Sequence, residues 1–109
     1  MIIRSTWWPI CATSIALCLT TVSARSDADD GEKLARRWCA SCHLAAPDQR
    51  QASTDAPPFA TIGRMPGFSR EKLAYFLLAP HPKMPDMSLS RSEAADLADY
   101  IAKFGRTGP

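Results

Sequence analysis

Several features that would assign this chain to other classes of protein are missing from its 109 residues. Basic side chains are not clustered: 13 lysines and arginines and 11 aspartates and glutamates are mixed along the sequence. Nucleic-acid binding would require clustered basic residues, so we expect no nucleic-acid partner. Strand-like runs, internal repeats and low-complexity segments are also absent from the sequence. These absences favour a single all-α domain.

A long apolar segment is missing as well. Residues 7–22 carry no charge, but this stretch is short for a membrane span and contains several serines and threonines. Small residues stand at its end, at Val22-Ser23-Ala24, where a signal peptidase could cut. We therefore expect residues 1–24 to be a cleaved signal peptide and residues 25–109 to be the functional domain, with an uncleaved anchor as the alternative.

Cysteine is scarce outside this leader. Two of the four cysteines, Cys11 and Cys18, lie inside it, and neither follows the small residue that a lipoprotein signal needs. The other two are Cys39 and Cys42, and His43 comes directly after them. A Cys-x-x-Cys-His pattern is typical of covalent c-type haem attachment. Two thiols at this spacing can reach the two vinyl groups of a porphyrin, and the histidine can bind the iron from one side.

Two other interpretations of the paired cysteines have weaker support. A zinc site needs a second pair of ligands, and beyond the motif the domain offers only His81. A thioredoxin-like redox pair needs a βαβ context, which the absence of strand-like runs disfavours. The motif therefore favours one covalently bound haem per chain. A buried porphyrin would also enlarge the core of so short a domain, so we expect haem loss to unfold it.

Three main helices are expected. The first has Asp29 or Asp30 as its cap, contains Gly31 where a second helix can approach, and continues into Cys39. A surface loop over residues 44–56 follows.

An extended segment at Pro57-Pro58-Phe59 closes this loop, because the residue before a proline is disfavoured in a helix. Phe59 and Ile62 are expected in the core, with one short helical turn between them. The second main helix should begin after Ser69 and end at Pro80. Its expected buried residues are Leu73, Phe76 and Leu77.

The last helix has the clearest start signal. Ser90 and Glu93 form a predicted capping box, and Gly105 is the expected C-terminal stop. Asp99 and Lys103 are expected to pair on the outer face of this helix. The expected buried face consists of Ala94, Leu97, Tyr100, Ile101 and Phe104.

A haem held by His43 would have one further axial position, and the residue that fills it decides the chemistry. Methionine sulfur there favours electron transfer at a raised potential, whereas an open position favours ligand binding or peroxidase-like chemistry. We favour Met84, because prolines at positions 80, 82 and 85 stiffen its loop and reduce the entropy lost on holding a weak ligand. The competing candidates are Met65, Met87 and His81.

In combination, these features resemble the class I c-type cytochromes, especially the small bacterial ones. The resemblance covers nearly all of residues 25–109 and implies a cytochrome c fold, with three main helices and loops wrapped around one covalently bound haem. The features that carry it are Gly31, Cys39-x-x-Cys42-His43, Pro57-Pro58-Phe59, Met84-Pro85 and Leu97-x-x-Tyr100-Ile101.

The resemblance also implies specific contacts. Gly31 should pack against the last helix near Leu97 and Tyr100. A backbone carbonyl in the proline segment, that of Pro57 or alternatively of Pro58, should accept the second N–H of the iron-binding histidine.

The function implied by the resemblance is that of a periplasmic one-electron carrier, not an enzyme, with its iron held by His43 and Met84. Haem attachment in bacterial relatives takes place outside the cytoplasm, which agrees with a signal peptide. The partners would be redox proteins that meet an exposed haem edge, with Lys83 as a candidate docking residue; a membrane anchor is not expected, and the protein should be a monomer or a weak oligomer. Two alternatives are a fixed electron-transfer subunit of a dehydrogenase or oxidase, and a haem domain that binds a gas or peroxide once Met84 leaves the iron.

Overall fold

The computed structural model describes residues 27–53, 55–79 and 82–107. Four helices and no strands occur in these ranges, which confirms the all-α prediction. The expected signal peptide at residues 1–24 and the candidate ligand His81 lie outside the described residues. None of the helices in the described ranges is long and apolar enough to cross a membrane. The helices are α1 (Ala28–Trp38), α2 (Phe59–Gly63), α3 (Arg70–Leu78) and α4 (Arg91–Arg106).

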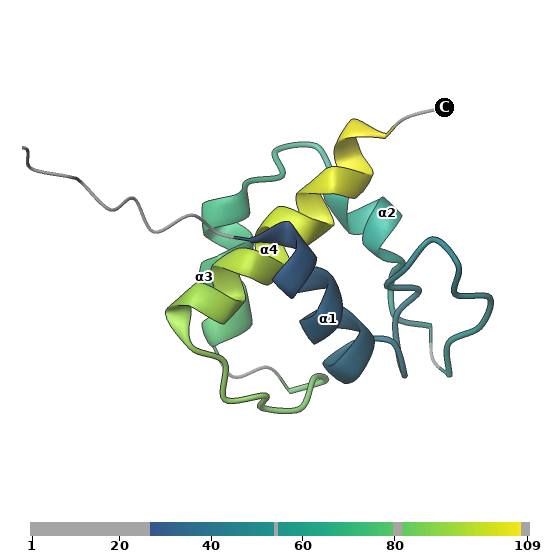
Figure 1. The fold of residues 1–109 in the computed structure, drawn as a ribbon, viewed down its shortest axis with the longest axis horizontal. Helices are drawn as coiled ribbons and strands as arrows, with labels where there is room; N and C mark the ends of the chain where they lie inside the picture. Colours follow the sequence, from purple (N-terminus) through teal and green to yellow (C-terminus); the bar gives the residue numbers. More distant parts are fainter. Residues whose placement is uncertain (1–26, 54, 80–81, 108–109) are drawn as a thin grey trace, which may run out of the picture.

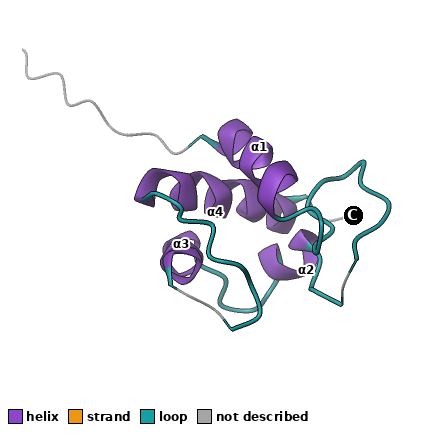
Figure 2. Ribbon diagram, turned by 90° about the horizontal axis from the view of Figure 1, so that it is seen from below, coloured by secondary structure: helices purple, strands orange, loops and turns teal. Residues whose placement is uncertain are grey.

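The last helix, α4, forms the centre of the fold. It packs against α1, α2 and α3, and in the view of Figure 2 it lies between α1 above and α2 and α3 below. Its capping box is present, with Ser90 and Glu93 bonded to each other's backbone N–H groups. The predicted buried face is largely confirmed, because all its members except the half-buried Phe104 are buried.

An aromatic cluster joins α2 to α4. The ring of Phe59, which is 3% exposed, stands edge-on to the rings of Tyr100 and Phe104, with both centroid distances at 6.2 Å. Edge-to-face packing of this kind adds to the free energy gained from burying the rings. The short helix that starts at Phe59 is therefore fixed to the core, as the sequence predicted.

Close helix crossings occur at two glycines. A Cβ atom on Gly31 would lie 2.0 Å from the carbonyl oxygen of Asp96 and 2.8 Å from the Cβ of Tyr100, which confirms the expected approach of α1 to α4. The expectation that Gly105 stops α4 is wrong, because the helix continues to Arg106. Gly105 instead allows α4 to approach α2: a Cβ there would lie 2.2 Å from the carbonyl oxygen of Gly63.

The start of α1 differs from the prediction. The cap is Asp27, whose side chain accepts a hydrogen bond from the N–H of Asp29, so Asp29 and Asp30 fall in the first turn. The N–H of Asp27 donates to the carboxylate of Asp96 at 2.7 Å. This contact with α4 fixes the chain before the helix begins, and sequence spacing alone does not reveal it.

The expected ion pair on α4 is also absent from the described residues. Asp99 pairs with Arg70 at 2.9 Å, and Lys103 pairs with Asp29 at 3.2 Å. Each of these two charges on α4 thus pairs with a residue of a neighbouring helix, Arg70 on α3 or Asp29 on α1, and not with the residue four positions away on α4.

The prediction for α3 is wrong in part. No residue of this helix is fully buried: Leu73 and Leu77 are half-buried against the core, and Phe76 is 50% exposed. The physical reason is that α3 packs on α4 along one side only (Figure 1). Part of its remaining apolar surface is therefore exposed, with Phe76 at 50% and Leu78 at 40%.

Candidate functional site

The two cysteines lie in a tight turn directly after α1. This helix ends at Trp38 with Cys39 as its C-cap, so it leads directly into the motif as expected, while the motif itself forms a turn outside the helix. The N–H groups of Cys42 and His43 both donate to the carbonyl of Cys39, at 3.1 and 2.8 Å. The turn therefore carries both thiols and the imidazole on one short, internally bonded segment.

The chemistry of the thiols argues against a redox-active pair. Cys39 is 6% exposed, and burial, together with the neighbouring Cys42 as the smaller cause, raises the pKa of its thiol to about 11. Reactive cysteines of thioredoxin-like proteins instead have lowered pKa values. In the described part of the chain the two cysteines are not joined in a disulfide. Neither sulfur atom is therefore used in a bond between the two cysteines.

His43 is held in one orientation by the proline segment. The imidazole is 9% exposed, and its Nδ1 lies 2.7 Å from the carbonyl oxygen of Pro57. A carbonyl can only accept a hydrogen bond, so Nδ1 carries a proton, and in the neutral imidazole the lone pair is then on Nε2. The contact with Pro57 that the resemblance implied is present. The arrangement is that of a metal-binding histidine whose other nitrogen is fixed by a backbone carbonyl.

The position of the proline segment is itself fixed by the chain on both sides. The N–H of Phe59 donates to the carbonyl of Leu44 at 3.0 Å, directly after His43. The ring of Phe59 lies 5.5 Å from the imidazole, centroid to centroid. The carbonyl of Pro57 is thereby directed at the histidine by the same residue that anchors α2 in the core.

The loop after His43 is more ordered than the sequence suggested. Ala45 and Ala46 are buried, and the side chain of Gln49 makes four hydrogen bonds, two within the loop and two to the turn that carries the cysteines and His43. The sequence gives no signal for this role, because nothing in the composition of the loop distinguishes Gln49 from the exposed Gln51.

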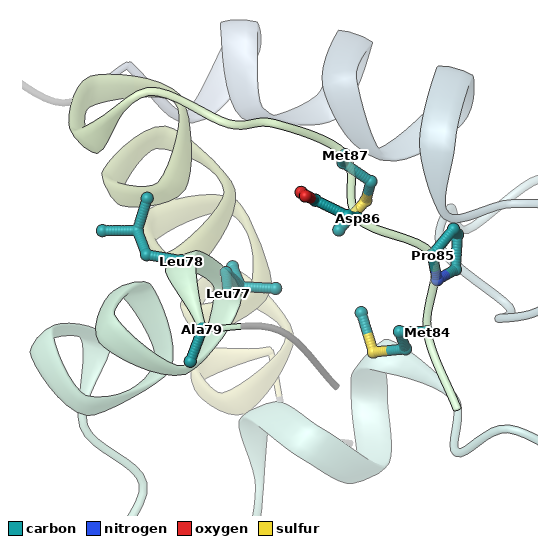
Figure 3. A pocket seen from close by; sticks show the side chains of 7 residues that line it. All are labelled: Leu77, Leu78, Ala79, Met84, Pro85, Asp86 and Met87. Atoms are coloured by element: carbon teal, nitrogen blue, oxygen red, sulfur yellow. The ribbon is translucent and has the colours of Figure 1, made fainter. Parts of the chain in front are cut away.

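Two of the candidate methionines share a pocket near the end of α3. Met84 and Met87 are both half-buried, and Figure 3 shows Met84 across this pocket from Leu77. The third candidate, Met65, is 50% exposed and does not line it. Of the three candidate methionines, Met84 and Met87 therefore share this pocket, and the pocket does not distinguish between them as iron ligands. Its lining residues are Leu77, Leu78, Ala79, Met84, Pro85, Asp86 and Met87.

The residues present fit a covalently bound haem. The turn offers two thiols, and His43 offers an Nε2 whose lone pair is not used by the hydrogen bond to Pro57. The fold also leaves large apolar side chains exposed, among them Trp38 at 41%, Phe76 at 50% and Leu78 at 40%. A porphyrin ring needs apolar surface of this kind on which to pack.

Comparison with known proteins gives two matches. Residues 26–101 match a family model described as cytochrome c oxidase, cbb3-type, subunit III. The chain is 52% identical over 95 residues to cytochrome c-552 of Bradyrhizobium diazoefficiens, an alignment that covers 87% of this chain and 91% of the relative. No solved structure matches the chain.

Proposed function

Because the chain belongs to the c-type cytochrome family that includes cbb3-type oxidase subunit III, we propose that it is a periplasmic one-electron carrier with iron bound by His43 and Met84. Family membership itself means that the protein binds a covalent c-type haem with iron and transfers electrons rather than acting as an enzyme. The ligand pair, the cellular location and the assignment of residues are the proposal.

One observation carries the proposal: His43, the last residue of the Cys-x-x-Cys-His turn, is hydrogen-bonded through Nδ1 to the carbonyl of Pro57. In this assignment Cys39 and Cys42 form the thioether bonds, and Nε2 of His43 binds iron. Pro57 completes the haem site by fixing the tautomer of the histidine and raising its basicity.

Met84 is the proposed second ligand. Its sulfur lies at the pocket beside α3, on a loop that Pro85 stiffens on one side. The entropy lost when a stiff loop holds a ligand is small, which favours retention of a weak thioether bond. Met87 lines the same pocket and is the competitor that an experiment has to exclude.

A haem held in this way supplies one-electron chemistry, with iron alternating between the ferric and ferrous states. His43 and Met84 would both remain bound to the iron in either state, so little structure would have to reorganise when an electron arrives or leaves. Thioether ligation and apolar surroundings both favour the ferrous state, because they disfavour the extra positive charge of ferric iron. These residues therefore set the potential and do not act on a substrate.

The proposed location follows from the sequence. Residues 1–24 are proposed to be a signal peptide cleaved after Ala24, leaving residues 25–109 as the monohaem domain. Electrons would pass to redox partner proteins in brief encounters that depend on surface charge and salt. Lys83 is exposed next to Met84 and is a candidate contact in those encounters.

The proposal is tested by comparing Met84→Ala with Met87→Ala in holoprotein made with a c-type maturation system. We expect Met84→Ala to lose the methionine-to-iron absorption of the ferric form and to bind carbon monoxide when reduced. Its potential should fall by a few tenths of a volt, within the roughly 0.8 V range that axial ligands can set. Met87→Ala should retain the spectrum and potential of the wild type. The reverse result would make Met87 the ligand, and carbon monoxide binding by the unaltered protein would favour a ligand-binding haem domain.

The description of the matched family favours a second candidate, a fixed subunit of an oxidase. The relative, which aligns over 87% of this chain, is named a cytochrome and not an oxidase subunit, which supports the carrier. Gentle purification from the native membrane and soluble fractions distinguishes the two. A carrier should be released as a monomer or weak oligomer, whereas a subunit should remain with a larger enzyme.

A further inference from the structure

We propose that Gln49 is a positioning residue for the haem site: its side-chain amide holds the backbone of the Cys-x-x-Cys-His turn and so fixes the orientation of His43. This inference deepens the proposed function and rests on iron binding by that histidine. Gln49 would not touch the haem; it would act through the segment that carries both thioether bonds and the iron ligand.

The geometry of the amide is unambiguous. Its Nε2 lies 2.7 Å from the carbonyl oxygen of Ala40, 2.8 Å from that of His43 and 2.9 Å from that of Gln51. Its Oε1 accepts the N–H of Ala45 at 2.9 Å. Carbonyl oxygens only accept and a backbone N–H only donates, so the partners determine which end of the amide is which. The two amide hydrogens are shared among three acceptors.

Two of these contacts lie in the segment that is proposed to hold the haem. Ala40 lies between the two cysteines, and the carbonyl of His43 belongs to the proposed iron ligand itself. One amide therefore ties the interior of the thioether segment to the backbone of the ligand. The imidazole is fixed at the opposite end by the carbonyl of Pro57. Loss of the amide would leave the imidazole held at Nδ1 and the N–H of His43 bonded to Cys39, but the carbonyl of His43 would lose the donor that Gln49 supplies. The peptide unit on that side of His43 could then shift and turn the ring about its bond to Pro57.

Other contacts would keep the loop folded if Gln49 were changed. The carbonyl of Ala45 accepts the hydroxyl of Tyr100 at 2.8 Å, and the carbonyl of Ser41 accepts both the N–H and the hydroxyl of Ser53. None of these bonds involves the carbonyl of Ala40 or of His43. Removal of the amide should therefore act locally, on the turn that carries the haem.

The test uses holoprotein with Gln49→Glu and the matched control Gln51→Glu. A carboxylate at position 49 cannot donate to the carbonyls, whereas the side chain of Gln51 is exposed and only its backbone is used. Both variants add the same charge two residues apart, so the difference between them removes most of the Coulomb effect. The measurements are the reduction potential and the paramagnetically shifted haem-methyl resonances of the ferric form, which report the orientation of the axial imidazole.

We expect Gln49→Glu to shift the haem-methyl pattern and to lower the potential below that of Gln51→Glu, which should resemble the wild type. If Gln49→Glu gives no holoprotein, Gln49→Asn serves as the second variant, because it keeps a neutral amide that is too short to reach all four partners. Unchanged methyl resonances and an unchanged potential in a Gln49 variant would overturn the proposal, even if the variant were less stable. The amide would then stabilise the loop without affecting the orientation of His43.

The outcome is independent of the identity of the second axial ligand. The spectrum of the unaltered protein and of Met84→Ala tests methionine ligation, whereas the comparison of positions 49 and 51 tests how the histidine is held. A failure of one therefore leaves the other interpretable.

Discussion

Tyr100 on α4 is hydrogen-bonded to the loop that follows His43. Its ring is 4% exposed, and its hydroxyl donates to the carbonyl of Ala45, two residues after His43. Two substitutions of this tyrosine separate the contribution of its hydrogen bond to stability from that of its ring packing. Tyr100→Phe keeps the ring and leaves the buried carbonyl of Ala45 without its donor, at a cost of about 1–3 kcal/mol. Tyr100→Ala also loses the packing of the ring and should cost about 3–5 kcal/mol.

Denaturant unfolding of the ferric holoproteins measures both losses. Equal destabilisation by the two variants would mean that the ring contributes little and that the hydrogen bond dominates. A loss well below 1 kcal/mol in Tyr100→Ala would contradict the packing of this residue between α1 and α4.

The same residue predicts a dependence of stability on pH. Burial, and secondarily the negative charge of Glu32, raises the pKa of Tyr100 to about 12, compared with about 10 in an unfolded chain. Between these values the unfolded chain has lost the proton that the folded protein still holds. Stability contributed by this group is thus complete below about pH 10 and falls as pH rises towards 12, by up to about 1.4 kcal/mol per unit.

Unfolding free energies of the wild type and Tyr100→Phe at several pH values across this window test the prediction. The stability difference between the two proteins should narrow as pH rises. A difference that stays constant from pH 9 to pH 12 would mean that the phenol titrates alike in the folded and unfolded states.

At the scale of the helices, the crossing of α1 and α4 depends on the absence of a side chain at Gly31. Alanine favours a helix over glycine by about 1 kcal/mol, so propensity alone predicts stabilisation by Gly31→Ala. The added Cβ would, however, meet the backbone of Asp96 at 2.0 Å, and backbone cannot move as a flexible side chain can. We expect net destabilisation of about 3 kcal/mol or more, at the upper end of overpacking costs.

Gly67 provides a control with open space. No heavy atom lies within 4 Å of a Cβ placed there, but its φ of +74° disfavours a side chain. Gly67→Ala should cost about 1–2 kcal/mol from backbone strain alone. Chemical denaturation of both holoproteins measures the two losses in unfolding free energy. A smaller loss for Gly31→Ala than for Gly67→Ala would contradict close contact between α1 and α4.

The elements that the sequence predicted well are those with local signals. The capping box of α4 is formed by Ser90 and Glu93 within one turn, and the start of α3 at Ser69 likewise depends on neighbouring residues. The start of α1 was misplaced because Asp27, Asp29 and Asp30 are all possible caps, and the contact with Asp96 that fixes Asp27 in place is long-range. Such a contact joins residues far apart in sequence, and no periodicity encodes it.

In the candidate site, too, the residues with a local sequence signal were predicted and those that depend on the folded chain were not. The cysteines and histidine are adjacent in sequence, so their pattern could be recognised directly. Gly105 was interpreted as a helix stop because a C-terminal glycine commonly has that role, whereas here it faces Gly63. Gln49 could not have been identified, since its four partners become neighbours only when the loop folds.

At the scale of the whole molecule, the protein core is thin. Six of the eleven buried hydrophobic residues in the described ranges are alanines, and Leu97 is the one large side chain there that is fully buried. Small domains gain little free energy from burial alone, and alanine contributes least to it. The apolar side chains left exposed on α3 and at Trp38 indicate that the haem, which family membership implies, is a structural part of this core.

We therefore predict that the chain without haem does not fold cooperatively. Secreted protein with Cys39→Ala, Cys42→Ala and His43→Ala together, which cannot attach or ligate the cofactor, should show far less helical circular dichroism than the holoprotein and no sigmoidal unfolding in urea. The holoprotein should unfold in a single transition, because porphyrin packing adds apolar contact to α3 that the protein alone does not provide. As a control, Cys42→Ala alone would retain one thioether bond and the iron ligand of the proposed site, and should fold with reduced stability. A triple variant that unfolds as sharply as the holoprotein would show that α1, α2, α3 and α4 form a sufficient core by themselves, and the exposed side chains of α3 would then need another explanation.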